Sequence, residues 1–149
     1  MTVWQSPVGW LDVRAGSNGI HSITLSSEKP MDATDHSLSD QCVAQLREYF
    51  VGERTAFDVP LAPVGTPFRM EVWRAAQRIP YGETRTYAEL ASMIGRPGAA
   101  RAVGNALKNN PIAILIPCHR IVSADGSIGG YAWGSEKKRI LLALERSAH

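Results

Sequence analysis

This chain of 149 residues lacks the features of a membrane, secreted or disulfide-bonded protein. No apolar run approaches the ~20 residues that a membrane-spanning helix needs, and Met1 to Gln5 have neither the basic nor the apolar region of a signal peptide. Only two cysteines occur, Cys42 and Cys118. These absences predict a cytoplasmic protein without a membrane partner, in which both thiols stay reduced.

Cofactor-binding patterns are also missing. The four histidines are scattered, and no Cys-x-x-Cys or His-x-x-x-His pair occurs. The chain has no glycine-rich fingerprint of a dinucleotide site or a P-loop. We therefore expect no metal and no cofactor.

Positive charge gathers toward the C-terminus. Residues 101–149 carry seven Lys or Arg and three acidic residues, a net charge of +4, whereas residues 1–100 carry −2. A basic surface suits an anionic partner such as nucleic acid, although a solvated charged surface would explain it equally well.

The chain divides into two parts by its patterns. Apolar residues alternate from Leu11 to Ala15, and the turn 17–19 then predicts a hairpin. A helix follows, from Ser37 or Ser39 to Tyr49 or Phe50. The connector 53–65 has two prolines and no helical period. We place the boundary here and predict an N-terminal α/β domain, 1–62, and a C-terminal domain, 63–149.

The C-terminal part is predicted to be mostly helical. Thr66-Pro67 is typical of a helix start, and Thr86 with Glu89 matches a capping box. The helix that Thr86 opens ends at Gly95, and a second runs from residue 99 to about 108. This spacing is typical of a helix-turn-helix or of two helices merely packed together. A final helix spans 135–146.

The segment Ile116-Pro117-Cys118-His119-Arg120 holds the candidate chemistry. The apolar run 112–116 is predicted to be a buried strand. A thiolate at its end is a nucleophile that His119 or Arg120 would promote. Side chains that follow each other in a strand point to opposite faces, so Cys118 and His119 cooperate only across a turn or a water.

Remote groups would complete such a site. Glu145, on the last helix, is the best acid available to orient His119 if that helix packs back on the turn. Arg120 either pairs with an acid or lies near a phosphate. A cysteine hydrolase is a weaker hypothesis, because no caspase-like or papain-like signature is present.

Pro117 to Val122, preceded by Asn110-Pro111, resembles the active-site signature of the O6-alkylguanine-DNA alkyltransferases, or methylated-DNA–protein-cysteine methyltransferases. The resemblance extends in order from about Gly65 to Glu145. It implies an α+β fold: a small ribonuclease H-like antiparallel sheet with a helix, then a mostly helical domain whose winged-helix-like helix-turn-helix carries the active site. It also implies a monomer.

The resemblance implies DNA repair by direct reversal of damage. An alkyl group would move irreversibly from O6 of guanine, or from O4 of thymine, in double-stranded DNA to Cys118. His119 would take the thiol proton through a water, and Glu145 would orient His119. Asn110 would hold the turn, and Tyr87 would donate a hydrogen bond to the departing guanine.

The same resemblance implies how DNA is held. The second helix would enter the minor groove, with Ala100 and Gly104 allowing close approach and Arg101 replacing the flipped base. Arg120 is a further candidate DNA contact. The pocket for guanine is predicted to use four residues: Ile121, Tyr131, Ala132 and Trp133.

A non-catalytic binder of alkylated DNA is the alternative within this resemblance. The alkyltransferase-like proteins carry another residue, often tryptophan, at the cysteine position. Cys118 therefore favours the enzyme.

Overall fold

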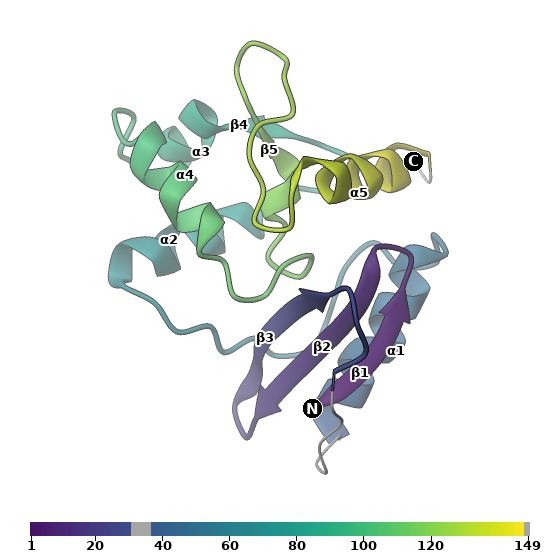
Figure 1. The fold of residues 1–149 in the computed structure, drawn as a ribbon. Helices are drawn as coiled ribbons and strands as arrows, with labels where there is room; N and C mark the ends of the chain where they lie inside the picture. The colour runs from purple at the N-terminus through teal and green to yellow at the C-terminus, as the bar shows by residue number, and fades with distance from the viewer. Residues whose placement is uncertain (31–36, 148–149) are drawn as a thin grey trace. The chain divides into compact units, whose positions relative to one another are not determined.

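The computed structural model describes residues 1–30 and 37–147, and the chain forms two compact units, Met1–Val64 and Gly65–His149 (Figure 1). Within the described residues, no helix has the length and apolar character needed to cross a membrane.

Over residues 1–30 and 37–64, the first unit is a three-stranded antiparallel sheet covered by one helix. Its strands are β1 (Thr2–Ser6), β2 (Gly9–Gly16) and β3 (Gly19–Ser26), in the order β1-β2-β3. Helix α1 (Ser37–Phe50) lies along one face of the sheet (Figure 1). The predicted hairpin and helix are confirmed. Alternate residues of β2 and one side of α1 supply the apolar core between them.

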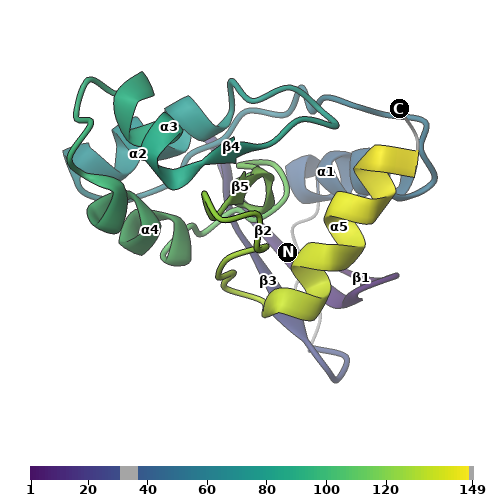
Figure 2. The same ribbon diagram turned by 90° about the horizontal axis from the view of Figure 1, so that it is seen from above.

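In its described residues, 65–147, the second unit carries four α-helices around a small parallel pair of strands. They are α2 (Pro67–Ala76), α3 (Tyr87–Met93), α4 (Ala100–Lys108) and α5 (Ser135–Ser147), with β4 (Arg85–Thr86) beside β5 (Ile121–Val122). Figure 2 shows α5 on the opposite side of the strand pair from α3 and α4.

Two predicted helix starts are confirmed in atomic detail. The Thr66 side chain accepts a hydrogen bond from the Arg69 N–H, and Pro67 occupies the first turn of α2. Thr86 and Glu89 form the reciprocal capping box that opens α3. These caps satisfy N–H groups of the first turn that the helix cannot pair internally. Because each cap joins residues only three positions apart, the local sequence is enough to predict it.

Helices α3 and α4 form the predicted helix-turn-helix, which packs on α2. Trp73 of α2 is buried, and its indole N–H donates to the Ala106 carbonyl of α4 over 2.9 Å. The buried face of α4 consists of Val103, Ala106 and Leu107. Its opposite face, which includes Arg101 and Asn105, is exposed.

The prediction that residues 112–116 form a strand is wrong. The run is a buried turn in which the Ile116 N–H donates to the Ile112 carbonyl over 2.9 Å. Ile114 has φ = +75°, a conformation that costs a β-branched residue energy. Asn110 holds the turn, because its Oδ1 accepts from Ile112 N–H and its Nδ2 donates to the Ile116 carbonyl. An apolar run that is buried on all sides has no hydrophobic periodicity, so its sequence does not distinguish a strand from a buried turn.

Candidate active site

Cys118 begins a single 3₁₀ turn, Cys118–Arg120, that follows this buried segment. The Cys118 N–H donates back to the Ile116 carbonyl over 2.7 Å, and the Arg120 N–H donates to the Pro117 carbonyl over 3.0 Å. The turn expected at Pro117 is therefore present. It lets adjacent side chains face different surroundings, with Cys118 on a cavity and His119 against α5.

The cavity has a volume of about 440 Å³, within the range of small-molecule sites. Its wall combines α4 with Tyr87 of α3, Cys118 and the segment 130–131. Five other predicted site residues join Cys118 there: Tyr87, Ala100, Arg101, Gly104 and Tyr131. The remaining lining residues, which the sequence analysis did not single out as site residues, are Asn105, Leu107, Lys108 and Gly130.

The Cys118 thiol is buried and receives a hydrogen bond. Asn110 Nδ2 lies 3.1 Å from Cys118 Sγ and is oriented to donate. Burial raises the pKa of the Cys118 thiol to about 11, although Asn110, the positive charge of Lys138 and Tyr131 each act to lower it. The group is therefore a protonated thiol at neutral pH, and its reaction as a nucleophile requires a base.

His119 and Glu145 are 26 residues apart in the sequence and form a buried pair. His119 Nε2 lies 2.6 Å from Glu145 Oε2, and both residues are almost completely buried. Burial lowers the pKa of His119, so its ring is neutral at pH 7. Since Nε2 faces a carboxylate, it carries the ring proton. Nδ1 is left as an acceptor, and it has no hydrogen-bond partner among the described residues.

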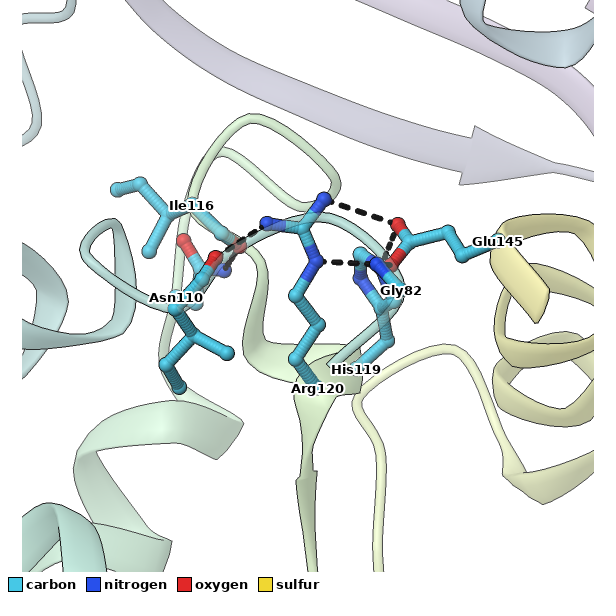
Figure 3. A network of polar contacts seen from close by, with 7 residues as sticks. Gly82, Asn110, Ile116, His119, Arg120 and Glu145 are labelled. Atoms are coloured by element: carbon cyan, nitrogen blue, oxygen red, sulfur yellow. Dashed lines mark hydrogen bonds and ion pairs between the residues drawn. The ribbon is translucent and has the colours of Figure 1, made fainter. Parts of the chain in front are cut away.

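Arg120 binds the same carboxylate, and this corrects the expectation that Arg120 contacts DNA. Its Nε lies 2.8 Å from Glu145 Oε1 and one terminal nitrogen lies 3.1 Å from Oε2 (Figure 3). The other terminal nitrogen donates to the Ile79 carbonyl over 2.7 Å. All three nitrogens of this buried guanidinium have protein partners, so Arg120 takes the alternative role of pairing with an acid.

Glu145 is held as a carboxylate by these contacts. Burial acts to raise its pKa, but the hydrogen bonds from His119 and Arg120 outweigh burial and lower the pKa to about 2. The backbone N–H of Gly82 lies 3.4 Å from Glu145 Oε1 and adds a weaker contact. Figure 3 shows Arg120 and His119 reaching toward Glu145, which projects from α5.

Lys138 is a site residue that the sequence analysis missed. It is fully buried, and its ammonium donates to the carbonyls of Ile121 and Gly130. Burial lowers its pKa to about 8, and the nearby Cys118 acts in the opposite direction. A signal was present, because Lys138 shares the inward stripe of α5 with Leu141, Leu142 and Glu145. A lysine within an apolar stripe is rarely buried without a specific partner.

Tyr87 is half-buried at the cavity, and its hydroxyl lies 3.5 Å from the Gly130 carbonyl. Burial is the main cause that raises the pKa of Tyr87, so the phenol stays protonated at neutral pH. A Cβ at Gly129 would come within 2.8 Å of the Tyr87 oxygen, and Gly129 has φ = +78°. Glycine therefore permits this close approach of the segment to Tyr87.

Three predicted pocket residues do not line this cavity. Ile121 is buried in β5, and its carbonyl binds Lys138. Ala132 is exposed. Trp133 packs edge-on against Tyr131 with 6.0 Å between ring centroids, so it contacts a residue that lines the cavity. Within residues 1–30 and 37–147, no cluster of three His, Cys, Asp or Glu side chains could hold a metal ion.

Comparisons with known proteins cover both units. The model of the "6-O-methylguanine DNA methyltransferase, DNA binding domain" matches residues 67–147, and that of the "6-O-methylguanine DNA methyltransferase, ribonuclease-like domain" matches residues 1–63. The methylated-DNA–protein-cysteine methyltransferase of Methanosarcina acetivorans is 43% identical over 97% of each chain. The constitutive one of Bacillus subtilis is 40% identical over 99% of this chain and 96% of its own.

Solved structures agree with this result. The crystal structure of Mycobacterium tuberculosis OGT in complex with DNA superposes with a TM-score of 0.87 and is 42% identical, covering 98% of this chain and 92% of its own. An O6-methylguanine DNA methyltransferase from Methanococcus jannaschii gives a TM-score of 0.67 at 26% identity, over 97% and 93% of the two chains. The α+β fold with a ribonuclease-like N-terminal domain is confirmed. The chain belongs to the 6-O-methylguanine DNA methyltransferase family.

Proposed function

We propose that this protein repairs double-stranded DNA by moving a methyl or larger alkyl group from O6 of guanine to Cys118. The observation that carries the proposal is the position of Cys118, which lines a cavity beside α4. His119, the next residue in the chain, is neutral and can act as a base. Family membership supports the reaction class, a methylated-DNA–protein-cysteine methyltransferase.

The first step is removal of the thiol proton. His119 Nδ1 accepts that proton through one water, and the imidazolium that forms is stabilised by the Glu145 carboxylate on Nε2. Arg120 donates to both oxygens of the same carboxylate, which restrains Glu145 against His119. Asn110 holds Cys118 Sγ in place and favours the thiolate by donating to it.

The second step is displacement at the alkyl carbon. A sulfur–carbon bond forms, the carbon–O6 bond breaks, and the electron pair of that bond stays on guanine. Tyr87, protonated at neutral pH and on the cavity wall, donates a hydrogen bond to the leaving guanine. The product is a thioether without an easy leaving group, so each molecule acts once.

DNA is held by the exposed face of α4. Small residues, Ala100 and Gly104, let the helix backbone approach the minor groove closely, and Arg101 enters the stack in place of the flipped base. We assign DNA binding and transfer to residues 63–149, with residues 1–62 as a separate domain. The protein acts as a monomer in the cytoplasm, where Cys118 stays reduced.

Intact-mass measurement tests the proposal. The protein is mixed with an equimolar duplex that contains one O6-methylguanine, and Cys118→Ala serves as the control. We expect a stable gain of one methylene mass on Cys118 in the wild type and none in the variant. A duplex with O4-methylthymine tests the second substrate in the same way. Binding without a mass change would instead identify a non-catalytic binder, and repeated turnover a hydrolase.

A further inference from the structure

The exposed face of α4 carries a polar side chain, Asn105, to which the proposed reaction gives no role. Between residues 101 and 108, only Arg101, Asn105 and Lys108 have polar side chains. Arg101 and Asn105 are four residues apart, so they lie on one face of the helix, and both are exposed. Asn105 therefore stands one turn beyond the residue that replaces the flipped base.

Arg101 and Asn105 form a ridge that separates two hollows in the surface, and we call this pair the crest of α4. Both line the cavity that holds Cys118, and both also line a second hollow of about 520 Å³ on the other side of α4. That second hollow is bordered by Thr66 and Arg69 at the start of α2. A duplex that follows α4 and delivers a base to Cys118 must pass over this crest.

The Asn105 amide is available for such a contact. Its backbone carbonyl accepts from Asn109 Nδ2 over 2.8 Å, but no hydrogen bond engages its side chain within residues 1–30 and 37–147. The neighbours Ala102 and Gly104 are too small to shield it. An exposed amide presents a donor and an acceptor side by side.

Resting on the proposed function, we propose that Asn105 is a specificity-determining residue that reads the minor-groove edge of a base pair flanking the lesion. Four helical residues rise about 6 Å, which is one to two base steps at about 3.4 Å each. Asn105 therefore reaches the first or second pair beside the position that Arg101 fills.

The chemistry of the amide predicts which pair is preferred. Every base pair offers acceptors in the minor groove, but only a G·C pair adds a donor, the guanine N2 amino group. The Asn105 side chain can donate to guanine N3 and accept from the N2 amino group together. An A·T pair satisfies only its donor. The protein is therefore expected to favour a G·C pair at the position that Asn105 reads.

Duplexes that differ in one flanking pair test this inference. Each contains one O6-methylguanine, and the first or second pair on either side is G·C, A·T or inosine·C, which lacks the N2 amino group. Dissociation constants are measured with the unreactive Cys118→Ala protein, and transfer rates with the wild type. We expect about fivefold tighter binding to the G·C duplex at one position, with inosine·C behaving as A·T.

Asn105→Ala is introduced into both the wild type and the Cys118→Ala protein. In both, it is expected to remove the preference for a G·C pair. Asn109→Ala is the matched control, because Asn109 is an exposed amide directly after the last residue of α4, lines neither hollow, and contacts Asn105 only at its backbone carbonyl. It should keep the preference. Since Asn105 is exposed and alanine favours a helix, the variant should fold, which thermal melting by circular dichroism checks.

The two measurements separate this inference from the proposed function. Failure of methyl transfer in the wild type would overturn the reaction, whereas the binding series would still report on Asn105. Equal affinities for all three pairs, or a preference that survives Asn105→Ala, would overturn the role of Asn105 even if transfer is normal. Absence of any DNA binding would overturn both.

Discussion

Lys138 and Glu145 lie seven residues apart on the buried face of α5, and each holds a different part of the Cys118 site. Glu145 binds His119, whereas Lys138 binds the carbonyl of Gly130 on the cavity wall. One helix thus fixes both the proposed base and the pocket that receives the substrate.

Replacing Glu145 with glutamine should slow transfer and destabilise the fold. The change keeps the size of the side chain but leaves the buried Arg120 guanidinium without its counter-charge. Breaking a buried pair in this way costs about 3 kcal/mol, which urea unfolding at pH 7 measures. Glu136→Gln, at an exposed position in the first turn of α5, is the control and should change stability little.

The same carboxylate predicts loss of stability in acid. The pKa of Glu145 is lowered from 4.5 to about 2 in the folded protein, so its stabilisation is complete above the unfolded value and is lost as the pH falls toward 2. The loss attributable to Glu145 is about 3 kcal/mol. Urea midpoints between about pH 5 and pH 2.5 should fall more steeply for the wild type than for Glu145→Gln. Parallel curves would contradict the assigned pKa.

Replacing Lys138 with methionine should slow methyl transfer about tenfold or more. The Gly130 and Ile121 carbonyls lose a charged donor worth about 1.5–3 kcal/mol, and the positive charge that favours the Cys118 thiolate disappears. Single-turnover rates at several pH values measure the effect, and the variant should need a higher pH for the same rate. Lys137→Met, on the preceding and partly exposed residue, should react as the wild type does.

Replacing Arg101 with alanine should slow repair of duplex DNA by about thirtyfold or more. Without Arg101, nothing fills the gap that the flipped base leaves in the stack, and the lost stacking and pairing energy is a few kcal/mol. Reaction with free O6-methylguanine needs no flipping and should keep most of its rate. Arg74→Ala, an exposed arginine on α2 away from the Cys118 cavity, is the control. An equal loss of rate on duplex DNA and on the free base would show that Arg101 has no role in base flipping.

Replacing Trp133 with glycine should speed reaction with O6-benzylguanine relative to O6-methylguanine. The indole packs against Tyr131, which lines the cavity, so its removal gives Tyr131 room to move away from a bulky group. The ratio of the two single-turnover rates is the measurement. If the wild type reacts equally fast with both substrates and Trp133→Gly leaves the ratio of the two rates unchanged, Trp133 does not narrow the pocket.

Local signals in the sequence determined the helices and hairpin of this protein. The caps at Thr66 and Thr86 and the turn at 17–19 act within a few residues, so their outcome depends little on the rest of the chain. The order of residues around Cys118 also indicated the family, because a motif is a property of the sequence itself.

Tertiary structure decided several contacts around Cys118 that the sequence left open or did not predict. Arg120 could have faced a phosphate or an acid, and only the packing of α5 brought Glu145 against it. The run 112–116 became a turn because Asn110 binds both of its ends. The burial of Lys138 required carbonyls from two other segments. The partners of Arg120 and Lys138 lie in other segments of the chain, and their meeting is set by the packing of the whole unit. Asn110 is close in sequence to the run 112–116, but a wholly apolar run carries no periodicity that distinguishes a turn from a strand.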